Sequence, residues 1–278
     1  MGANRDRFIW SKRMKITFIG AGNMSEAIIA GALKQKVVAA DAVTVSDPLE
    51  ERRKHMRQAY GIHTEEDNAR AVVHAEVVVL AVKPQVFPYV WGTLQSAISS
   101  SSLVVSIMAG VTSETIAAGS DLRVVRVMPN TPSLVARGVS GIAQGALATE
   151  LDMEITERLM QAVGVSVRVE EEQLHAVTAL SGSGPAYLFY LMEAMMDSAK
   201  KLGLDEATAR LLCIETVGGA ADLLASSDDS PEEFRSRVTS KGGTTAAAIQ
   251  TFDERHLKEV VSDAMERAFA RSKELASE

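Results

Sequence analysis

The first half of the chain alternates short runs rich in Val and Ile with segments of helical periodicity. These runs show no polar alternation, which indicates burial on both faces and is typical of a parallel sheet with helices on each side. Alternation of this kind predicts an α/β fold with a doubly wound sheet. We expect strands at 14–20, 42–47, 76–82, 102–108, 122–128, 139–145 and 165–169.

After about residue 171 the pattern consists of helices alone, which we expect at 186–203, 205–226, 231–238, 245–251 and 254–276. The first two are apolar around much of their surface, and such helices must be buried. The remaining helices are too few to cover them, so we expect a second subunit to do so. The predicted organisation is a disordered extension at 1–13, an α/β domain at 14–170 and an all-α dimerisation domain at 171–278.

The composition narrows the class of protein. The 278 residues are 46% apolar and carry a formal net charge of -7, which disfavours nucleic acid as the main partner. Cys213 is the single cysteine, so no internal disulfide can form and a reducing, cytoplasmic compartment is expected. No apolar run reaches the ~18 residues that a membrane helix needs, and we expect no membrane association.

A glycine turn follows the first predicted strand in the stretch FIGAGNMSEA, residues 18–27. Gly20 permits the tight turn, and Gly22 lets a pyrophosphate approach the backbone. The following helix directs its N-terminal N–H groups at that anion. Ser25 replaces the usual third glycine and is small enough for close packing between helix and strand. In its position after a first strand, the turn predicts a Rossmann-type dinucleotide site.

The ends of the other predicted strands carry polar residues that can complete this site. After the second strand, Asp47 can accept a hydrogen bond from the 2′-hydroxyl of NAD. Ser46, Arg52 and Arg53 can instead bind the 2′-phosphate of NADP, although both arginines also fit a solvated helix face. The sequence leaves the choice of cofactor open.

Two later strand exits also fall at the carboxyl edge of the sheet, where doubly wound folds bind ligands. Lys83 lies in the AVKPQ exit and can contact phosphate or ribose, or simply be a surface lysine. Asn130 and Thr131 lie in the proline-stiffened loop MPNTP. We expect this loop near the nicotinamide.

The helical half contains two glycine-rich loops, SGSGPAY at 181–187 and TSKGGTTAA at 239–247. Consecutive N–H groups at a Gly-Gly-Thr-Thr helix start form an anion-binding concavity, whereas the simpler interpretation is a turn with a threonine cap. Two such loops beside a dinucleotide domain favour a small carboxylate substrate.

The motifs GAGNM, AVKP, SIMAGV, MPNTP, SGSGPAY and SKGGTT occur in this order and resemble those of Δ1-pyrroline-5-carboxylate reductases. The resemblance covers residues 15–275. It implies the last step of proline biosynthesis, in which NADPH, or NADH, reduces a cyclic imine to L-proline. It also implies a homodimer with interleaved helical domains, often assembled into a larger ring such as a decamer.

By position, the resemblance implies cofactor contacts at Gly20, Gly22, Asn23, Met24, Asn68, Ala81, Val82, Lys83 and Pro84. It implies substrate contacts at Ser240, Gly242, Gly243, Thr244 and Thr245. The one departure is Lys241, where the family usually has proline, so we expect this loop to be less rigid.

The implied reaction needs no metal and no covalent intermediate. Thr245 is the candidate catalytic residue, as donor of a hydrogen bond to the imine nitrogen. Because threonine is a poor acid, we expect the proton to arrive through water or on an iminium substrate. The five histidines do not cluster in the motif loops, so none is expected to act in acid–base catalysis.

Two other functions fit parts of the sequence. A β-hydroxyacid dehydrogenase shares the two-domain plan, but its catalytic lysine should lie early in the helix at 186–203, where the first lysine is Lys200. A nicotinamide-sensing regulator without turnover is the alternative from another class, and the intact Gly-Gly-Thr-Thr loop argues against it.

Overall fold

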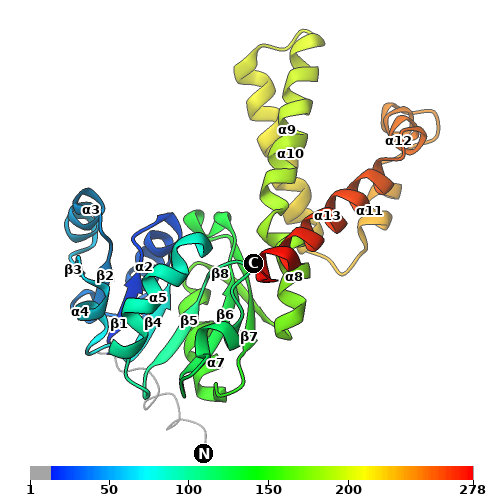
Figure 1. The fold of residues 1–278 in the computed structure, drawn as a ribbon. Helices are drawn as coiled ribbons and strands as arrows, with labels where there is room; N and C mark the ends of the chain where they lie inside the picture. Colours follow the sequence, from blue (N-terminus) through cyan, green and yellow to red (C-terminus); the bar gives the residue numbers. More distant parts are fainter. Residues whose placement is uncertain (1–13, 278) are drawn as a thin grey trace, which may run out of the picture. The chain divides into compact units, whose positions relative to one another are not determined.

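The computed structural model describes residues 14–277, and an eight-stranded sheet organises its first part (Figure 1). The strand order is β3-β2-β1-β4-β5-β6-β7-β8. Each of the seven expected strand segments overlaps one strand, with β7 and β8 beginning one residue earlier than expected, and the extension at 1–13 lies outside the described residues. The strands are β1 (Ile16–Ile19), β2 (Val43–Ser46), β3 (His63–Glu65), β4 (Val77–Leu80), β5 (Leu103–Ser106), β6 (Arg123–Met128), β7 (Gly138–Gln144) and β8 (Gly164–Arg168).

The sheet is parallel from β3 through β6, as the uniformly apolar runs predict. β1 is central, with Ile16 beside Val43 on one side and Val77 on the other. β7 runs antiparallel to β6, and β8 is parallel to β7. The expected doubly wound α/β fold is therefore confirmed, with a reversed pair of strands at one edge.

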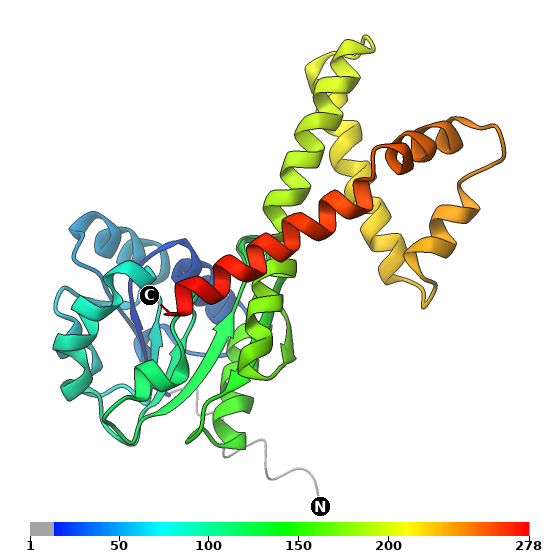
Figure 2. The same cartoon turned by 45° about the vertical axis from the view of Figure 1, so that its right-hand side comes forward.

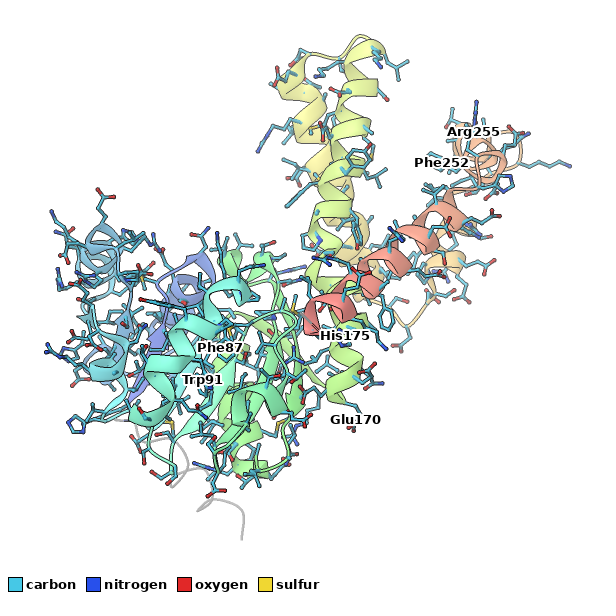
Figure 3. All side chains as sticks on the ribbon, viewed as in Figure 1. Phe87, Trp91, Glu170, His175, Phe252 and Arg255 are labelled. Atoms are coloured by element: carbon cyan, nitrogen blue, oxygen red, sulfur yellow. The ribbon has the colours of Figure 1, made fainter. Side chains whose placement is uncertain are left out.

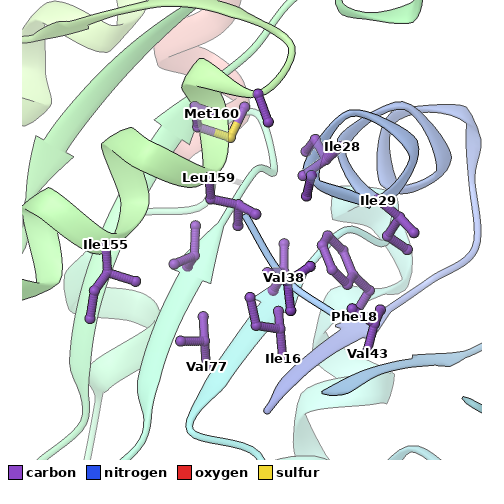
Figure 4. Close-up of a cluster of buried hydrophobic side chains, with 14 of the residues drawn as sticks. Ile16, Phe18, Ile28, Ile29, Val38, Val43, Val77, Ile155, Leu159 and Met160 are labelled. Carbon is purple, nitrogen blue, oxygen red and sulfur yellow. The ribbon is translucent and has the colours of Figure 1, made fainter. Parts of the chain in front are cut away.

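Helices cover both faces of the sheet and bury two apolar clusters. One cluster joins α2 and α7 to the strands through residues such as Phe18, Ile28 and Leu159 (Figure 4). The other cluster lies on the opposite face and includes Trp91 of α5 and Ile116 of α6. The helices are α2 (Asn23–Lys34), α3 (Glu50–Tyr60), α4 (Asn68–Val72), α5 (Phe87–Leu94), α6 (Ser113–Ala117) and α7 (Glu150–Gln161).

A short helical segment that the sequence did not predict follows β8. It comprises a 3₁₀ turn at Glu171–Gln173, α8 (Leu174–Val177) and one π-helical turn at Thr178–Gly182. α8 lies over β7, since a side chain at Gly141 would meet Leu174 and Val177. Glycine at this position allows the helix to approach the sheet closely.

The chain forms two compact units. The first holds the sheet and the last residues from 268 on, and the second runs from 184 to 267. The predicted domain boundary at 170/171 comes earlier than this division, because the segment with α8 belongs to the sheet unit. The remaining helices are α9 (Gly184–Lys201), α10 (Glu206–Ala225), α11 (Pro231–Arg237), α12 (Thr244–Glu254) and α13 (Leu257–Ser277).

Within the second unit, α9 and α10 pack against each other as a helical pair (Figure 2). Few of their apolar side chains are covered, with Cys213 and Ala209 among the buried exceptions. Phe189 is 66% exposed and Leu211 is 61% exposed. Such a large uncovered apolar surface is typical of an oligomer interface.

Candidate functional site

The glycine turn after β1 has the backbone geometry that the motif predicts. Gly20 has a φ of +103°, and its N–H donates to the carbonyl of Ser46 over 2.8 Å. A Cβ at this position would lie 2.8 Å from the carbonyl oxygen of Ala81. Both the positive φ and the approach of β4 therefore exclude larger residues at Gly20.

Gly22 is the N-cap residue of α2, with a φ of −71°. No side chain caps this helix end, and Gly22 and Asn23 are exposed. A Cβ on Gly22 would have no atom within 4 Å, so the space in front of the helix is open. An uncapped helix N-terminus with open space before it fits the pyrophosphate of a dinucleotide.

Two charged residues brace the turn from the side of β2. The Asp47 carboxylate accepts hydrogen bonds from Ala21 N–H over 2.8 Å and Leu49 N–H over 2.9 Å. Arg52 donates from Nε to the Ala21 carbonyl over 2.8 Å. The sequence suggested both residues for ribose or phosphate binding, and the structure adds a role in ordering the turn.

Arg53 does not offer a free charge to a cofactor. Its side chain is buried, donates to the Asp47 carbonyl over 2.6 Å and pairs with Glu50 and Glu66. Arg53 therefore supports the end of β2, in contrast to the role in 2′-phosphate binding that the sequence allowed.

Asn68 is joined to the end of β2 by a hydrogen bond of 2.7 Å from Ser46 Oγ to its Oδ1. This bond uses the amide oxygen of Asn68, the first residue of α4. The structure thus brings Ser46, Asp47 and Asn68 together with the glycine turn at the carboxyl edge of the sheet.

Glu26 links α2 to α3 on the same side of the turn. Its carboxylate accepts from Arg52 over 2.7 Å and from Tyr60 over 2.9 Å, and it lies 2.6 Å from His55 Nε2. Burial alone would raise the pKa of Glu26, but these hydrogen bonds outweigh it and lower the pKa to about 2. Sequence analysis did not identify this cluster, because its members meet only once α3 has packed beside α2.

The segment that follows β4, residues 81–84, lies at the same carboxyl edge of the sheet as the glycine turn. Ala81 N–H donates to the Ile19 carbonyl over 2.9 Å, and Pro84 begins a 3₁₀ turn for which Lys83 is the N-cap. Val82 is partly exposed and Lys83 is exposed. Phe87 and Trp91 anchor the following helix, with ring centroids 5.4 Å apart (Figure 3).

The loop after β6 is ordered by Asn130. The side chain is buried, donates from Nδ2 to the Ser181 carbonyl over 3.1 Å and accepts from Val139 N–H over 2.8 Å. This geometry gives Asn130 a role in shaping the loop. The predicted contact with a cofactor stays a prediction.

A buried charged cluster supports the neighbouring loop after β5. Arg126 of β6 pairs with Glu171 over 3.1 Å, and Glu171 also accepts from Ser113 N–H at the start of α6 over 2.8 Å. Burial raises the pKa of Glu171, but the bonds from Ser113 and the charge of Arg126 outweigh it and hold the pKa below its usual value. No local sequence pattern pointed to this cluster, because its members are far apart along the chain.

The last turns of α13 complete the same face of the sheet. His175 Nδ1 lies 2.9 Å from Ser272 Oγ, and both side chains are buried. Burial lowers the pKa of His175 and outweighs the nearby charge of Glu172, which acts to raise it.

The second glycine-rich loop lies before α12. Gly242 has a φ of +75°, and Gly243 is the N-cap residue with no side chain bonded to the helix end. Gly243 N–H donates to the Ser240 carbonyl over 3.0 Å, and a Cβ at Gly243 would lie 2.5 Å from Ser240 Oγ. Thr244 and Thr245 are the first residues of the helix, so neither is its N-cap residue.

Two absences are relevant to the site. Among residues 14–277, no three or more His, Cys, Asp or Glu side chains are grouped to hold a metal ion. None of the helices in this described range has the length and apolar character needed to cross a bilayer.

Comparisons with known proteins agree with this geometry. Residues 171–275 match the family model for pyrroline-5-carboxylate reductase dimerisation. Residues 15–110 match the model described as NADP oxidoreductase, coenzyme F420-dependent. Residues 171–275 thus form a dimerisation domain, and the chain forms a homo-oligomer.

Curated relatives extend the match to nearly the whole chain. The pyrroline-5-carboxylate reductase of Pseudomonas aeruginosa is 44% identical, over 95% of this chain and 97% of its own length. That of Methanosarcina acetivorans is 40% identical, over 95% of this chain and 98% of its own. A solved pyrroline-5-carboxylate reductase from Coxiella burnetii has a TM-score of 0.87 at 37% identity, covering 95% of this chain and 99% of that one. The NADP-bound structure of Plasmodium falciparum pyrroline carboxylate reductase has the same TM-score at 25% identity and the same coverage. The chain belongs to the pyrroline-5-carboxylate reductase family.

Proposed function

We propose that this chain reduces 1-pyrroline-5-carboxylate to L-proline with NADPH as hydride donor. The observation that carries the proposal is the pair of uncapped, glycine-led helix starts, one at Gly22 and one at Gly243. One start suits the pyrophosphate of a dinucleotide, and the other suits the carboxylate of a small substrate. The family relationship supports a cyclic imino acid as the substrate.

The cofactor is held by the carboxyl edge of the sheet. N–H groups of the first turn of α2, at Gly22, Asn23 and Met24, bind the pyrophosphate. Ser46, Asp47 and Asn68 lie at the ribose end, where the Arg52 guanidinium is paired with Glu26 over 2.7 Å. Ala81 to Pro84 and the loop at Asn130 line the path toward the nicotinamide.

The substrate carboxylate is bound by the loop before α12. In this proposal the N–H groups of Gly242 and Thr244 bind the carboxylate, whereas the Gly243 N–H donates to the Ser240 carbonyl and orders the loop. Lys241 is exposed, and its charge strengthens the attraction for an anionic substrate.

The bound cofactor supplies a hydride to the imine carbon, and the protein aligns the reactants and excludes water. Thr245 is the catalytic residue: its hydroxyl donates a hydrogen bond to the ring nitrogen, where electron density grows as the C=N bond is reduced. A hydrogen bond that strengthens in this way lowers the barrier instead of merely tightening substrate binding. The proton on nitrogen comes from water or from an iminium substrate.

The assembly proposed here is a dimer with interleaved helical domains that can build a larger ring, such as a decamer, in the cytoplasm. The uncovered apolar surface of α9 and α10 supports a dimer that does not dissociate at micromolar concentration. Light scattering that found a stable, active monomer at that concentration would contradict it.

The test of function is turnover by the purified chain. NADPH oxidation is followed by its near-ultraviolet absorbance with pyrroline-5-carboxylate, and L-proline is identified as the product. Parallel reactions with NADH give the cofactor preference, and a 3-hydroxy acid with NADP⁺ tests the dehydrogenase alternative. Binding of NADPH without proline formation would refute the proposed function.

A further inference from the structure

The edge strand β8 has an apolar face that the chain itself leaves bare. Val165 is 59% exposed and Val167 is 55% exposed. They are two residues apart on one strand, so their side chains lie on the same face of the sheet. Exposed valines in this arrangement differ from singly scattered apolar residues, which need no explanation.

The register shows which face this is. Val167 pairs with Gly141 of β7, and a side chain at Gly141 would meet Leu174 and Val177 of α8. The two valines therefore lie on the α8 side of the sheet. α8 packs over β7 and leaves the neighbouring face of β8 exposed.

The opposite face of β8 is occupied by α7. Arg168 pairs with Glu157 of α7, from Nε to Oε1 over 2.6 Å. Ser166, between the valines, points to this side and its Oγ is buried. One face of the strand is thus packed and charged, and the other is apolar and open.

β8 also has a single strand neighbour, β7, among the described residues. An uncovered edge strand with apolar side chains is an aggregation hazard, which proteins normally block with charges, proline or a covering element. Neither Val165 nor Val167 offers such protection. A covering element must therefore come from elsewhere.

We propose that a second copy of this chain covers the Val165–Val167 face of β8. The choice of occupant follows from continuity with the dimerisation region, which begins at residue 171, just after β8 ends at Arg168. α8, the neighbour of this face, lies inside that region. The homo-oligomer interface thus extends beyond the helical unit onto the edge of the sheet.

Cysteine labelling tests this directly on the full-length oligomer. In a Cys213→Ala background, Val165→Cys and Val167→Cys are compared with Val73→Cys, a 56% exposed valine at the end of α4. The expected result is labelling by a water-soluble maleimide at least about tenfold slower at both β8 positions than at Val73. Equal labelling rates would show an open face and overturn the proposal.

A second experiment measures how much this face contributes to the dissociation constant of the oligomer. Val167→Glu places a charge in the covered face and should weaken self-association at least about tenfold, as measured by sedimentation against concentration. Val73→Glu, the matched control, should leave the dissociation constant unchanged. Circular dichroism checks that both variants are folded. A folded Val167→Glu variant with the parental dissociation constant would also overturn the proposal, and neither experiment depends on turnover.

Discussion

The two glycines of the first turn should respond to substitution in opposite ways, because the structure gives them different tasks. Gly22→Val places a branched side chain at a position with φ −71° and ψ 175°, where no atom lies within 4 Å. That backbone conformation is ordinary for a β-branched residue. The fold should therefore tolerate the change to within about 0.5 kcal/mol, as for other surface substitutions.

The same valine fills the open space in front of α2, where the pyrophosphate is proposed to bind. Each charge-assisted hydrogen bond that is lost costs roughly 1.5–3 kcal/mol. Loss of one such bond weakens NADPH binding about 10- to 150-fold. Titration of the protein with NADPH, followed by fluorescence or calorimetry, measures this directly.

Gly20→Ala is the matched control. The positive φ of +103° costs an alanine roughly 1–3 kcal/mol, and the new Cβ would press on the carbonyl of Ala81. At about 2–4 °C per kcal/mol, the melting temperature should fall by roughly 2–12 °C, whereas Gly22→Val should shift it little. A Gly22→Val variant with parental affinity for NADPH would refute the assignment of the dinucleotide site.

Three further changes test other parts of the molecule. Thr245→Val should lower kcat about 5- to 150-fold, because one hydrogen bond of roughly 1–3 kcal/mol is lost, and KM for NADPH should change little. Thr245→Ser keeps a hydroxyl and should retain most of the parental rate. A parental kcat in the valine variant would show that the hydroxyl has no role in the reaction. Glu26→Gln tests how the free energy of unfolding depends on pH in the acid range. The pKa of Glu26 is about 2 in the folded state against the usual 4.5. The carboxylate therefore stabilises the fold fully above pH 4.5 and loses this effect as the pH falls toward 2. Urea unfolding midpoints of the Glu26→Gln variant should therefore fall less over this range than those of the parent, and parallel curves would contradict the assignment. Gly31→Ala should destabilise the sheet unit in thermal melts, because its Cβ would lie 2.6 Å from the carbonyl oxygen of Ala162; an unchanged melting temperature would show that this contact relaxes freely.

The sequence predicted the sheet well where strands are buried on both faces, because such strands consist almost entirely of apolar residues. The Val-Val-Val-Leu run of β4 and the Leu-Val-Val-Ser run of β5 are buried throughout. β3 escaped prediction because His63, Thr64 and Glu65 are polar residues at an edge, with one strand neighbour among the described residues. The reversal of β7 was equally invisible, since direction depends on how the chain returns after the loop at Asn130.

The candidate site was predictable to the extent that it is local. The turn at Gly20 and Gly22 is a constraint within a few residues, so the motif alone identified it. The hydrogen bond from Arg52 to the Ala21 carbonyl and the ion pair of Arg126 with Glu171 connect distant parts of the chain. Charged side chains of this kind acquire partners only through tertiary packing, and local sequence patterns do not show which distant residues will meet.

The return of α13 to the sheet unit has a consequence for the order in which the protein folds during synthesis. The last strand of the sheet ends at Arg168, yet Ser272 beside His175 and Leu275 beside Gly110 come from the far end of the chain. The whole of 184–267 must be made in between. Until then, the face of the sheet around His175 and the loop at Gly110 stay uncovered on the ribosome. The first domain to begin folding is therefore among the last parts of the molecule to be completed.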